Sequence, residues 1–223
     1  MKNHILQIDK KLKATKRMLL KECILKNDID FSNDFILPYS KANTISDTKL
    51  IFIGQDPTVR RKESRSDINV TLNLDKRNSL KTYLNKVCNI LQIDIEKEVY
   101  ATNLYKCFFN FPPADDQTIL TRHFKVWIDL LINELTTFKN PIVITLGEPL
   151  INQLIHSNSK QVKYYWDYIG QTKSGGNFKC NESNENYLQR RIYPIAHQPT
   201  WNRNKFYKTY LNDYLDFIKR NEK

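Results

Sequence analysis

The chain has 223 residues, enough for one α/β domain with a sizeable hydrophobic core. Lysine and arginine total 35 against 24 acidic residues, and the formal net charge of +11 favours a polyanionic partner. No run of about 18 apolar residues occurs, which excludes a transmembrane helix and predicts no membrane partner.

The cysteines indicate a reducing compartment. Cys23, Cys88, Cys107 and Cys180 form no C-x-x-C pair, and several lie in apolar patterns where a reduced cysteine acts as a small hydrophobe. The first residues are charged and lack the apolar stretch of a secretory signal. We therefore expect a cytoplasmic protein without disulfides. The histidines show no ligand spacing either, so we predict no metal and no other cofactor.

Residues 1–47 are predicted to form a helical extension that packs on a single domain comprising residues 1–223. Apolar side chains recur at roughly helical spacing in the basic first 30 residues, namely Ile5, Ile8, Leu12, Leu19 and Leu20. We expect the lysines between them to form a solvated face, and the alternative is a nucleic-acid surface. Pro38 and several Asn and Ser residues predict a loop over residues 31–47.

A buried strand is predicted over residues 49–54. Its unbroken apolar run is typical of a strand that is covered on both faces. Gly54 and Pro57 end the strand, and Asp56 follows directly. In open α/β sheets, ligands bind at the carboxyl ends of the strands, so Asp56 is a candidate functional residue. The alternative is that Asp56 only caps a turn or the next helix.

The next segment, residues 58–78, is a polar and basic connection. Because it follows Asp56, its arginines, Arg60 and Arg61 among them, are placed to hold phosphates. Apolar residues at helical spacing then predict a helix over residues 80–91, with Asn78 or Ser79 as its N-cap.

Three further strands are predicted, at residues 99–105, 141–147 and 192–196. Amphipathic helices separate or follow them, and Pro149 suits the first turn of one. The polar stretch 157–189 is long for a loop and favours a short hairpin or a mobile segment. The alternation predicts a single-domain, three-layer α/β/α fold with a central four-stranded parallel sheet.

Asp56, Asn103 and His197 each follow the carboxyl end of a predicted strand, so they converge on one crevice. A carboxylate can orient a water and stabilise positive charge on a sugar. An amide matches the edge of a nucleobase, and an imidazole can hydrogen-bond a developing oxyanion. Taken singly, Asn103 is equally well explained as a strand-end turn residue and His197 as a structural loop histidine.

These motifs resemble those of the uracil-DNA glycosylase superfamily. Gly54-Gln55-Asp56-Pro57 is similar to the first motif, G-Q-D-P-Y-H, and residues 101–107 followed by Pro112-Pro113 resemble the second conserved strand. Residues 143–147 are similar to the third strand, and His197-Gln198-Pro199 resembles the last motif, H-P-S. The resemblance implies a divergent member in which Asp56 positions the water, Asn103 reads uracil and His197 stabilises the departing anion. Gly54, Gln55 and Thr58 would then contact the substrate.

The chain also departs from that pattern. Thr58 and Val59 stand where the best-known branch has Tyr and His. If the backbone follows the family path, the resemblance implies that the smaller Thr58 leaves space beside C5 of the base. The aromatic residue that stacks on uracil would fall near Asn69 or Val70. Aromatic side chains that can replace it are Phe108, Phe109 and Phe111, although such residues more often belong to the core.

Trp201 follows His197 by four residues, where the best-known branch carries a leucine wedge. We expect it to enter the DNA stack, and the alternative is a core tryptophan. The DNA-binding residues predicted in all are Arg60, Arg61, Trp201, Asn202 and Arg203.

The sequence thus predicts a monomeric DNA N-glycosylase of base-excision repair. It would flip a damaged base, uracil first, out of single- or double-stranded DNA and hydrolyse its N-glycosidic bond. One alternative is a non-catalytic nucleic-acid-binding relative of the same fold. Another is a small-molecule α/β enzyme, which the lack of a glycine-rich phosphate fingerprint disfavours.

Overall fold

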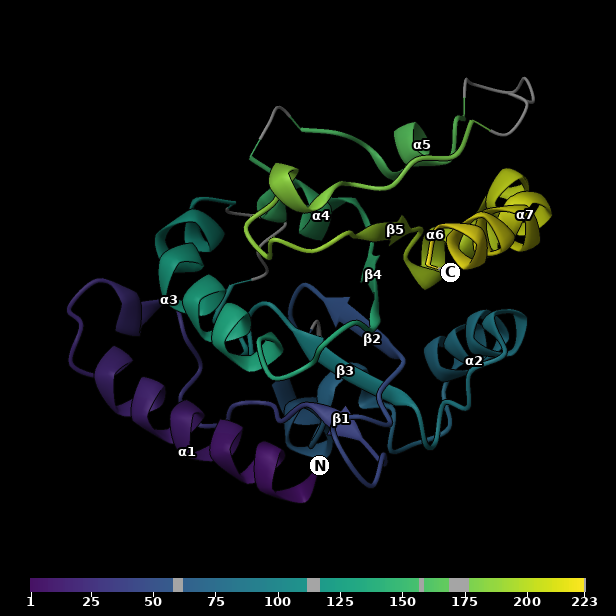
Figure 1. Cartoon of the computed structure of the whole chain (residues 1–223). Helices are drawn as coiled ribbons and strands as arrows, with labels where there is room; N and C mark the ends of the chain where they lie inside the picture. The colour runs from purple at the N-terminus through teal and green to yellow at the C-terminus, as the bar shows by residue number, and fades with distance from the viewer. Residues whose placement is uncertain (58–61, 112–116, 157–158, 169–176, 223) are drawn as a thin grey trace.

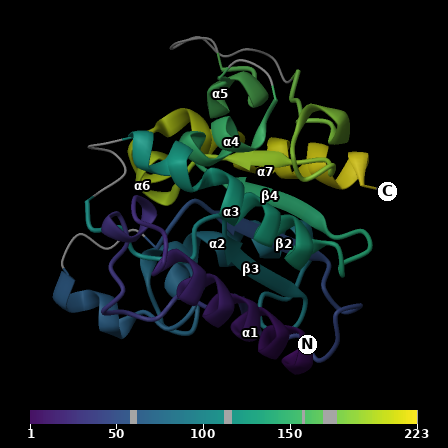
Figure 2. The same ribbon diagram turned by 90° about the vertical axis from the view of Figure 1, so that its left-hand side faces the viewer.

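The structure is a computed structural model that describes residues 1–57, 62–111, 117–156, 159–168 and 177–222. Helices α1 and α3 lie on one side of a central sheet and α2, α6 and α7 on the other, which makes three layers (Figures 1 and 2). The strands are β1 (Tyr39–Ser40), β2 (Leu50–Gly54), β3 (Val99–Asn103), β4 (Ile142–Leu146) and β5 (Tyr193–Ile195). The α-helices are α1 (Lys2–Leu19), α2 (Ser79–Leu91), α3 (Gln117–Leu135), α4 (Glu148–Leu154), α5 (Val162–Tyr165), α6 (Gln198–Arg203) and α7 (Lys205–Asn221). Short 3-10 helices are η1 (Leu25–Asn27), η2 (Lys62–Asp67), η3 (Thr71–Asn73) and η4 (Ser183–Glu185).

The strand order is β1-β3-β2-β4-β5, and β3, β2, β4 and β5 run parallel. This confirms the predicted α/β/α fold and its four parallel strands. A fifth strand differs from the prediction, because Tyr39–Ser40, expected in a loop, pairs antiparallel with β3. Because β1 has only two residues, too few to show an alternating pattern, the sequence gives no sign of it. At the opposite edge of the sheet, the Trp166 indole donates a 2.8 Å hydrogen bond to the carbonyl of Pro194 in β5.

Layers on both faces explain the apolar strands. All five residues of β2 are buried, as the unbroken apolar run predicted. The N-cap of α2 is Asn78, whose side chain accepts a 2.7 Å hydrogen bond from the Lys81 backbone N–H, and this confirms one of the two predicted caps. Pro149 lies in the first turn of α4, also as predicted.

Helix α1 buries an apolar stripe against the core, and its lysines Lys10 and Lys11 are exposed. The buried residues of that stripe include Ile8, Leu12 and Leu19. None of the helices in the described part of the chain is long and apolar enough to cross a membrane.

A buried ion pair joins α3 to the end of β3. Lys106 Nζ lies 2.8 Å from Glu134 Oε2, and neither side chain is exposed. Lys106 also donates to the Thr102 hydroxyl and, at 3.0 Å, to the carbonyl of Asn103, while the Tyr100 hydroxyl donates to Glu134 at 2.7 Å. Burial lowers the pKa of Lys106, and the charge of Glu134 opposes that shift. The pair therefore fixes the backbone on which Asn103 sits.

We predict that Lys106→Met lowers the free energy of unfolding by about 3–5 kcal/mol, because it leaves the Glu134 carboxylate buried without a counter-charge. Urea denaturation measures the change. Lys125→Met is the matched control, since the Lys125–Asp129 pair of the same helix is exposed and should add little. Replacing both partners, in Lys106→Met/Glu134→Leu, should restore part of the loss. Equal losses for Lys106→Met and Lys125→Met would contradict the prediction.

Candidate functional site

The centre of the site is the contact between the last residues of β2 and β3. Gly54 and Asn103 are direct neighbours in the parallel register. The ladder continues beyond them, as Leu104 N–H donates to Gly54 at 2.9 Å and Tyr105 N–H to Gln55 at 2.8 Å. A methyl group at Gly54 would overlap Asn103 Oδ1. Glycine is therefore needed at position 54 for the Asn103 amide to lie across the end of β2.

The Asn103 amide is buried and has no hydrogen-bond partner among the described residues. The side chain is fully inaccessible, and both Nδ2 and Oδ1 lack a partner. Leaving a buried donor or acceptor unpaired costs about 1–3 kcal/mol. Such an amide is suited to a planar ligand that presents one acceptor and one donor on the same edge.

Asp56 lies at the same edge, two residues beyond Gly54, and its side chain is half-buried. Its charge is felt by the loop that follows Asn103. Burial raises the pKa of the Cys107 thiol, and the negative charge of Asp56 raises it further. The same carboxylate contributes to the raised pKa of Tyr105, after burial and the charge of Cys107. Asp56 thus places a negative charge beside the loop that starts at Asn103.

His197 reaches this edge from β5 as the N-cap residue of α6. Gly147, which follows β4, has a φ of +88°, and a Cβ there would lie 3.3 Å from His197 Cβ. The backbone before His197 is held by Tyr83, whose hydroxyl donates to the Ala196 carbonyl at 3.1 Å. The His197 side chain is exposed to solvent, but nearby protein atoms exclude part of the water around the ring. This desolvation lowers the pKa of His197, so the imidazole is neutral at neutral pH.

The structure places Asp56, Asn103 and His197 at one edge of the sheet. Asn103 ends β3, Asp56 follows β2, and His197 packs on the residue after β4. In the strand order, β2 and β4 lie between β3, which carries Asn103, and β5, which precedes His197.

The family comparison agrees with this arrangement. The family model described as the Uracil DNA glycosylase superfamily matches residues 42–219, which is most of the chain. The chain belongs to the uracil DNA glycosylase superfamily. This confirms the resemblance expected from the motifs, and it supports a DNA glycosylase of the hydrolase class with DNA as its substrate. A search among curated proteins finds no match to the chain.

One residue of the site was missed by the sequence analysis. Leu72 has a left-handed backbone, with φ of 57°, and its Cδ2 would lie 2.8 Å from a methyl group on Gly54. A bulky residue in this conformation is strained, and strain of this kind gathers at functional sites. The Thr71 N–H donates to the Leu37 carbonyl at 2.8 Å and holds the segment in place. Leu72 is thus the apolar side chain beside Gly54 and Asn103, and it lies three residues beyond Asn69. The sequence does not reveal its left-handed backbone, because only a glycine at position 72 would have signalled it.

The aromatic alternatives lie elsewhere. Phe108 is buried under the Arg65 guanidinium, 5.2 Å from its ring centroid, and Phe109 packs edge-on against His123. Phe111 is exposed. Several predicted residues fall outside the described part of the chain: Thr58, Arg60, Arg61, Pro112 and Pro113.

Trp201 is half-buried and stacks on Tyr83, with ring centroids 4.7 Å apart and planes at 26°. The ammonium groups of Lys86 and Lys208 lie 5.4 and 5.8 Å from its ring. Tyr83 is thus the packing partner that a core role of Trp201 requires. Entry of Trp201 into the DNA stack stays a prediction. Asn202 and Arg203 are exposed on α6.

We predict that Gly54→Ala destabilises the fold by about 1–3 kcal/mol, because the added methyl group overpacks the Asn103 amide. Asn103→Ala removes that amide, so Gly54→Ala should cost clearly less in the Asn103→Ala background. Thermal unfolding of the four proteins of this double-mutant cycle measures the coupling. Additive effects would show that the two residues do not press on each other.

Proposed function

We propose that this member of the superfamily hydrolyses the N-glycosidic bond of uracil that has been flipped out of DNA, in base-excision repair. The observation that carries the proposal is the buried amide of Asn103, which has no partner in the described part of the chain and lies at the strand edge that also bears Asp56. Flipping is required because the target bond is inaccessible within stacked DNA.

Asn103 accounts for recognition of the base. Its Nδ2 would donate to uracil O4, and its Oδ1 would accept from N3–H, in one plane. Cytosine presents the opposite pattern at these two positions, so both amide groups would stay unpaired. Lys106 and Gly54 hold the Asn103 backbone and leave room for its amide, which keeps the amide oriented before DNA binds.

Asp56 and His197 account for the chemistry. As the bond between C1′ and N1 breaks, the Asp56 carboxylate orients a water toward C1′ and stabilises the positive charge that develops on the sugar. The hydroxyl of the water goes to C1′ and its proton to the carboxylate. The departing uracil carries negative charge on O2, to which the neutral His197 imidazole donates a hydrogen bond.

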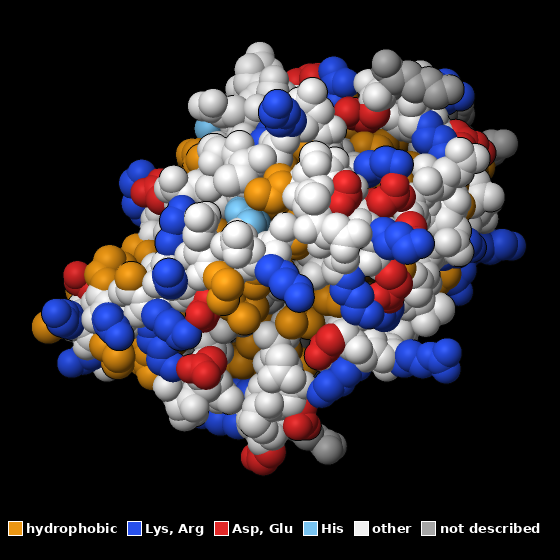
Figure 3. All heavy atoms as spheres, turned by 60° about the horizontal axis from the view of Figure 1, so that its bottom comes forward, with side chains coloured by type: hydrophobic (Ala, Val, Ile, Leu, Met, Phe, Trp, Pro, Cys, Tyr) orange, Lys and Arg blue, Asp and Glu red, His pale blue; other side chains and the backbone are white. Residues whose placement is uncertain are grey.

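The charge of the chain supports DNA as partner. On the face shown in Figure 3, basic side chains are interspersed with acidic ones and form no single patch. Beside Trp201, in contrast, Lys86 and Lys208 contact the aromatic ring and no carboxylate among the described residues. Together with exposed Arg203, they supply positive charge near His197 that phosphates would complement.

The test is incubation with single- and double-stranded DNA that contains one uracil, followed by alkali to cleave abasic sites. Asp56→Asn should lower excision by about two to four decades and leave DNA binding largely intact, as for a positioned general base. Asp213→Asn, an exposed carboxylate on α7, is the control and should excise normally. Binding without excision by the unaltered chain would instead select the non-catalytic relative.

The same assay with other bases tests specificity. We expect uracil to be excised first, cytosine to be spared, and 5-substituted uracils to be tolerated in part, because Thr58 is smaller than the tyrosine of the best-known branch. One lost steric contact changes discrimination by only about 1–3 kcal/mol. If the unaltered chain rejects 5-hydroxymethyluracil as strongly as Thr58→Tyr does, no open space exists beside C5.

We further predict that Trp201→Ala lowers excision from duplex DNA more than from single strands, where less unstacking is needed. Trp201→Phe, which keeps a ring to stack on Tyr83, separates packing from insertion. Equal losses on both substrates, together with a lower melting temperature that Trp201→Phe restores, would assign Trp201 to packing alone.

A further inference from the structure

Residues 1–41 precede the part of the chain that matches the superfamily, yet they cover the loop that leaves Asn103. Asp30 N–H donates to the Phe108 carbonyl at 2.9 Å, and Ile36 N–H donates to the Lys106 carbonyl at 2.7 Å. In the other direction, Asn110 N–H donates to the Asp28 carbonyl at 2.8 Å. The segment thus lies along the loop formed by residues 104–110.

Asp30 links this segment to the connection that follows Asp56. Its Oδ2 accepts a 2.6 Å hydrogen bond from Arg65 in η2, the first described element after Pro57, and Arg65 is only 7% exposed. The same guanidinium donates to the Phe109 carbonyl at 2.8 Å and lies over the Phe108 ring. One ion pair therefore joins three segments: residues 28–30, η2 and the loop after Asn103.

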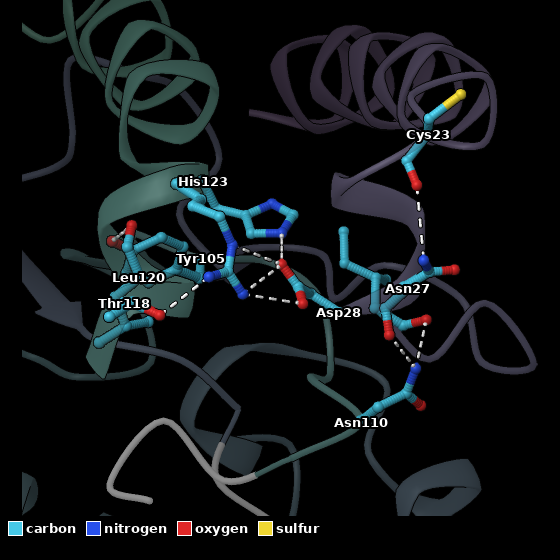
Figure 4. Close-up of polar contacts among 10 residues, drawn as sticks. Cys23, Asn27, Asp28, Tyr105, Asn110, Thr118, Leu120 and His123 are labelled. Carbon is cyan, nitrogen blue, oxygen red and sulfur yellow. Dashed lines mark hydrogen bonds and ion pairs between the residues drawn. The ribbon is translucent and has the colours of Figure 1, made fainter. Parts of the chain in front are cut away.

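Asp28 makes a second link, shown in Figure 4, to the first turns of α3. Its carboxylate accepts from Arg122 at 3.1–3.3 Å and lies 3.1 Å from His123 Nε2, on a fully buried ring. The Asn110 side chain closes the cluster by donating to the carbonyls of Asn27 and Ile29 at 3.0 and 3.1 Å. The loop after Asn103 is thus held at its far end as well.

Charge pairs of this kind fix an arrangement more than they add stability. Taking two charges out of water is costly, and apolar residues of similar size stabilise a fold at least as well. The short Asp30–Arg65 contact and the hydrogen bond from Arg65 to the Phe109 carbonyl restrict the loops to one relative position.

We propose that Asp28 and Asp30 are positioning residues of the site: they hold the loops after Asp56 and Asn103 in register, so excision depends on a segment outside the family match. This rests on the proposed function. Neither aspartate touches the substrate, and both act through Arg65, Arg122 and the loop backbone.

The Asp30 contact is maintained at the pH of the assay. Burial raises the pKa of Asp30, but hydrogen bonds from Ser32, Arg65 and Asn33 outweigh it and bring the pKa to about 2. Because the folded-state pKa lies below the ordinary value, the contact stabilises the protein fully above about pH 4 and is lost as the pH falls through about 2. Measurements at neutral pH therefore compare an intact pair with its variants.

The experiment compares Asp28→Asn, Asp30→Asn, Arg65→Met and the double variant Asp30→Asn/Arg65→Met on single-stranded DNA with one uracil. At a temperature where every variant is folded, we expect the single-turnover rate at saturating DNA to fall by about 10- to 100-fold, as for misplaced reacting groups. Affinity for uracil-free DNA should stay within about twofold. The double variant should be no slower than the slower single variant, and Asp30→Glu should recover part of the rate.

Asp34→Asn is the matched control from the same segment, because Asp34 is fully exposed. Hydrogen–deuterium exchange of residues 62–67 and 104–110 gives a second readout, and exchange should be faster in Asp28→Asn and Asp30→Asn. Unchanged rates, or unchanged exchange, in folded variants would overturn the proposal. If the unaltered chain excises no base, the proposed function fails, and the exchange measurement alone decides whether the two aspartates hold the loops.

Discussion

The site depends on one close approach, that of the Gly54 backbone to the Asn103 amide at two neighbouring parallel strand ends. Because no side chain stands at position 54, a polar amide is buried at the strand end with its donor and acceptor unpaired among the described residues. The buried Lys106–Glu134 pair fixes that strand end, because Lys106 also donates to the Asn103 carbonyl, and the Leu72 side chain lies beside Gly54. A fold that leaves two hydrogen-bonding groups unsatisfied gives up stability there, and a ligand with the complementary edge recovers it.

The parallel sheet explains how residues far apart in sequence meet. Every strand of a parallel sheet delivers its following residue to the same edge, so Asp56 and Asn103 arrive together without any local signal that links them. His197 follows β5, two positions away from β2, and packs closely on Gly147, which has no side chain and a positive φ. The hydroxyl of Tyr83 and the N-cap position then fix where the chain turns.

Much of this was accessible from the sequence, because apolar runs identify buried strands and the order of elements identifies a parallel sheet. The strand end at Gly54 was predicted for that reason, and Asn103 was placed near the end of a strand expected to run to residue 105. Asn78, one of the two predicted N-caps, was found from its residue type. What was missed depends on contacts between distant residues. Leu72 carries no mark of its left-handed backbone, and Asp30 finds Arg65 35 positions away within a stretch of many charges. Single-sequence patterns also cannot decide whether Trp201 packs or inserts, since both uses need the same aromatic surface.

The two edges of the sheet have a consequence for behaviour at high concentration. An exposed edge strand offers unpaired N–H and carbonyl groups on which another chain can build a strand. Here β3 is capped by β1, only two residues long, and β5 carries Pro194, whose missing N–H and Trp166-bound carbonyl leave little to pair with. Neither edge is a good template for strand addition, so the sheet resists growth into aggregates even though its strands are among the most apolar segments of the chain.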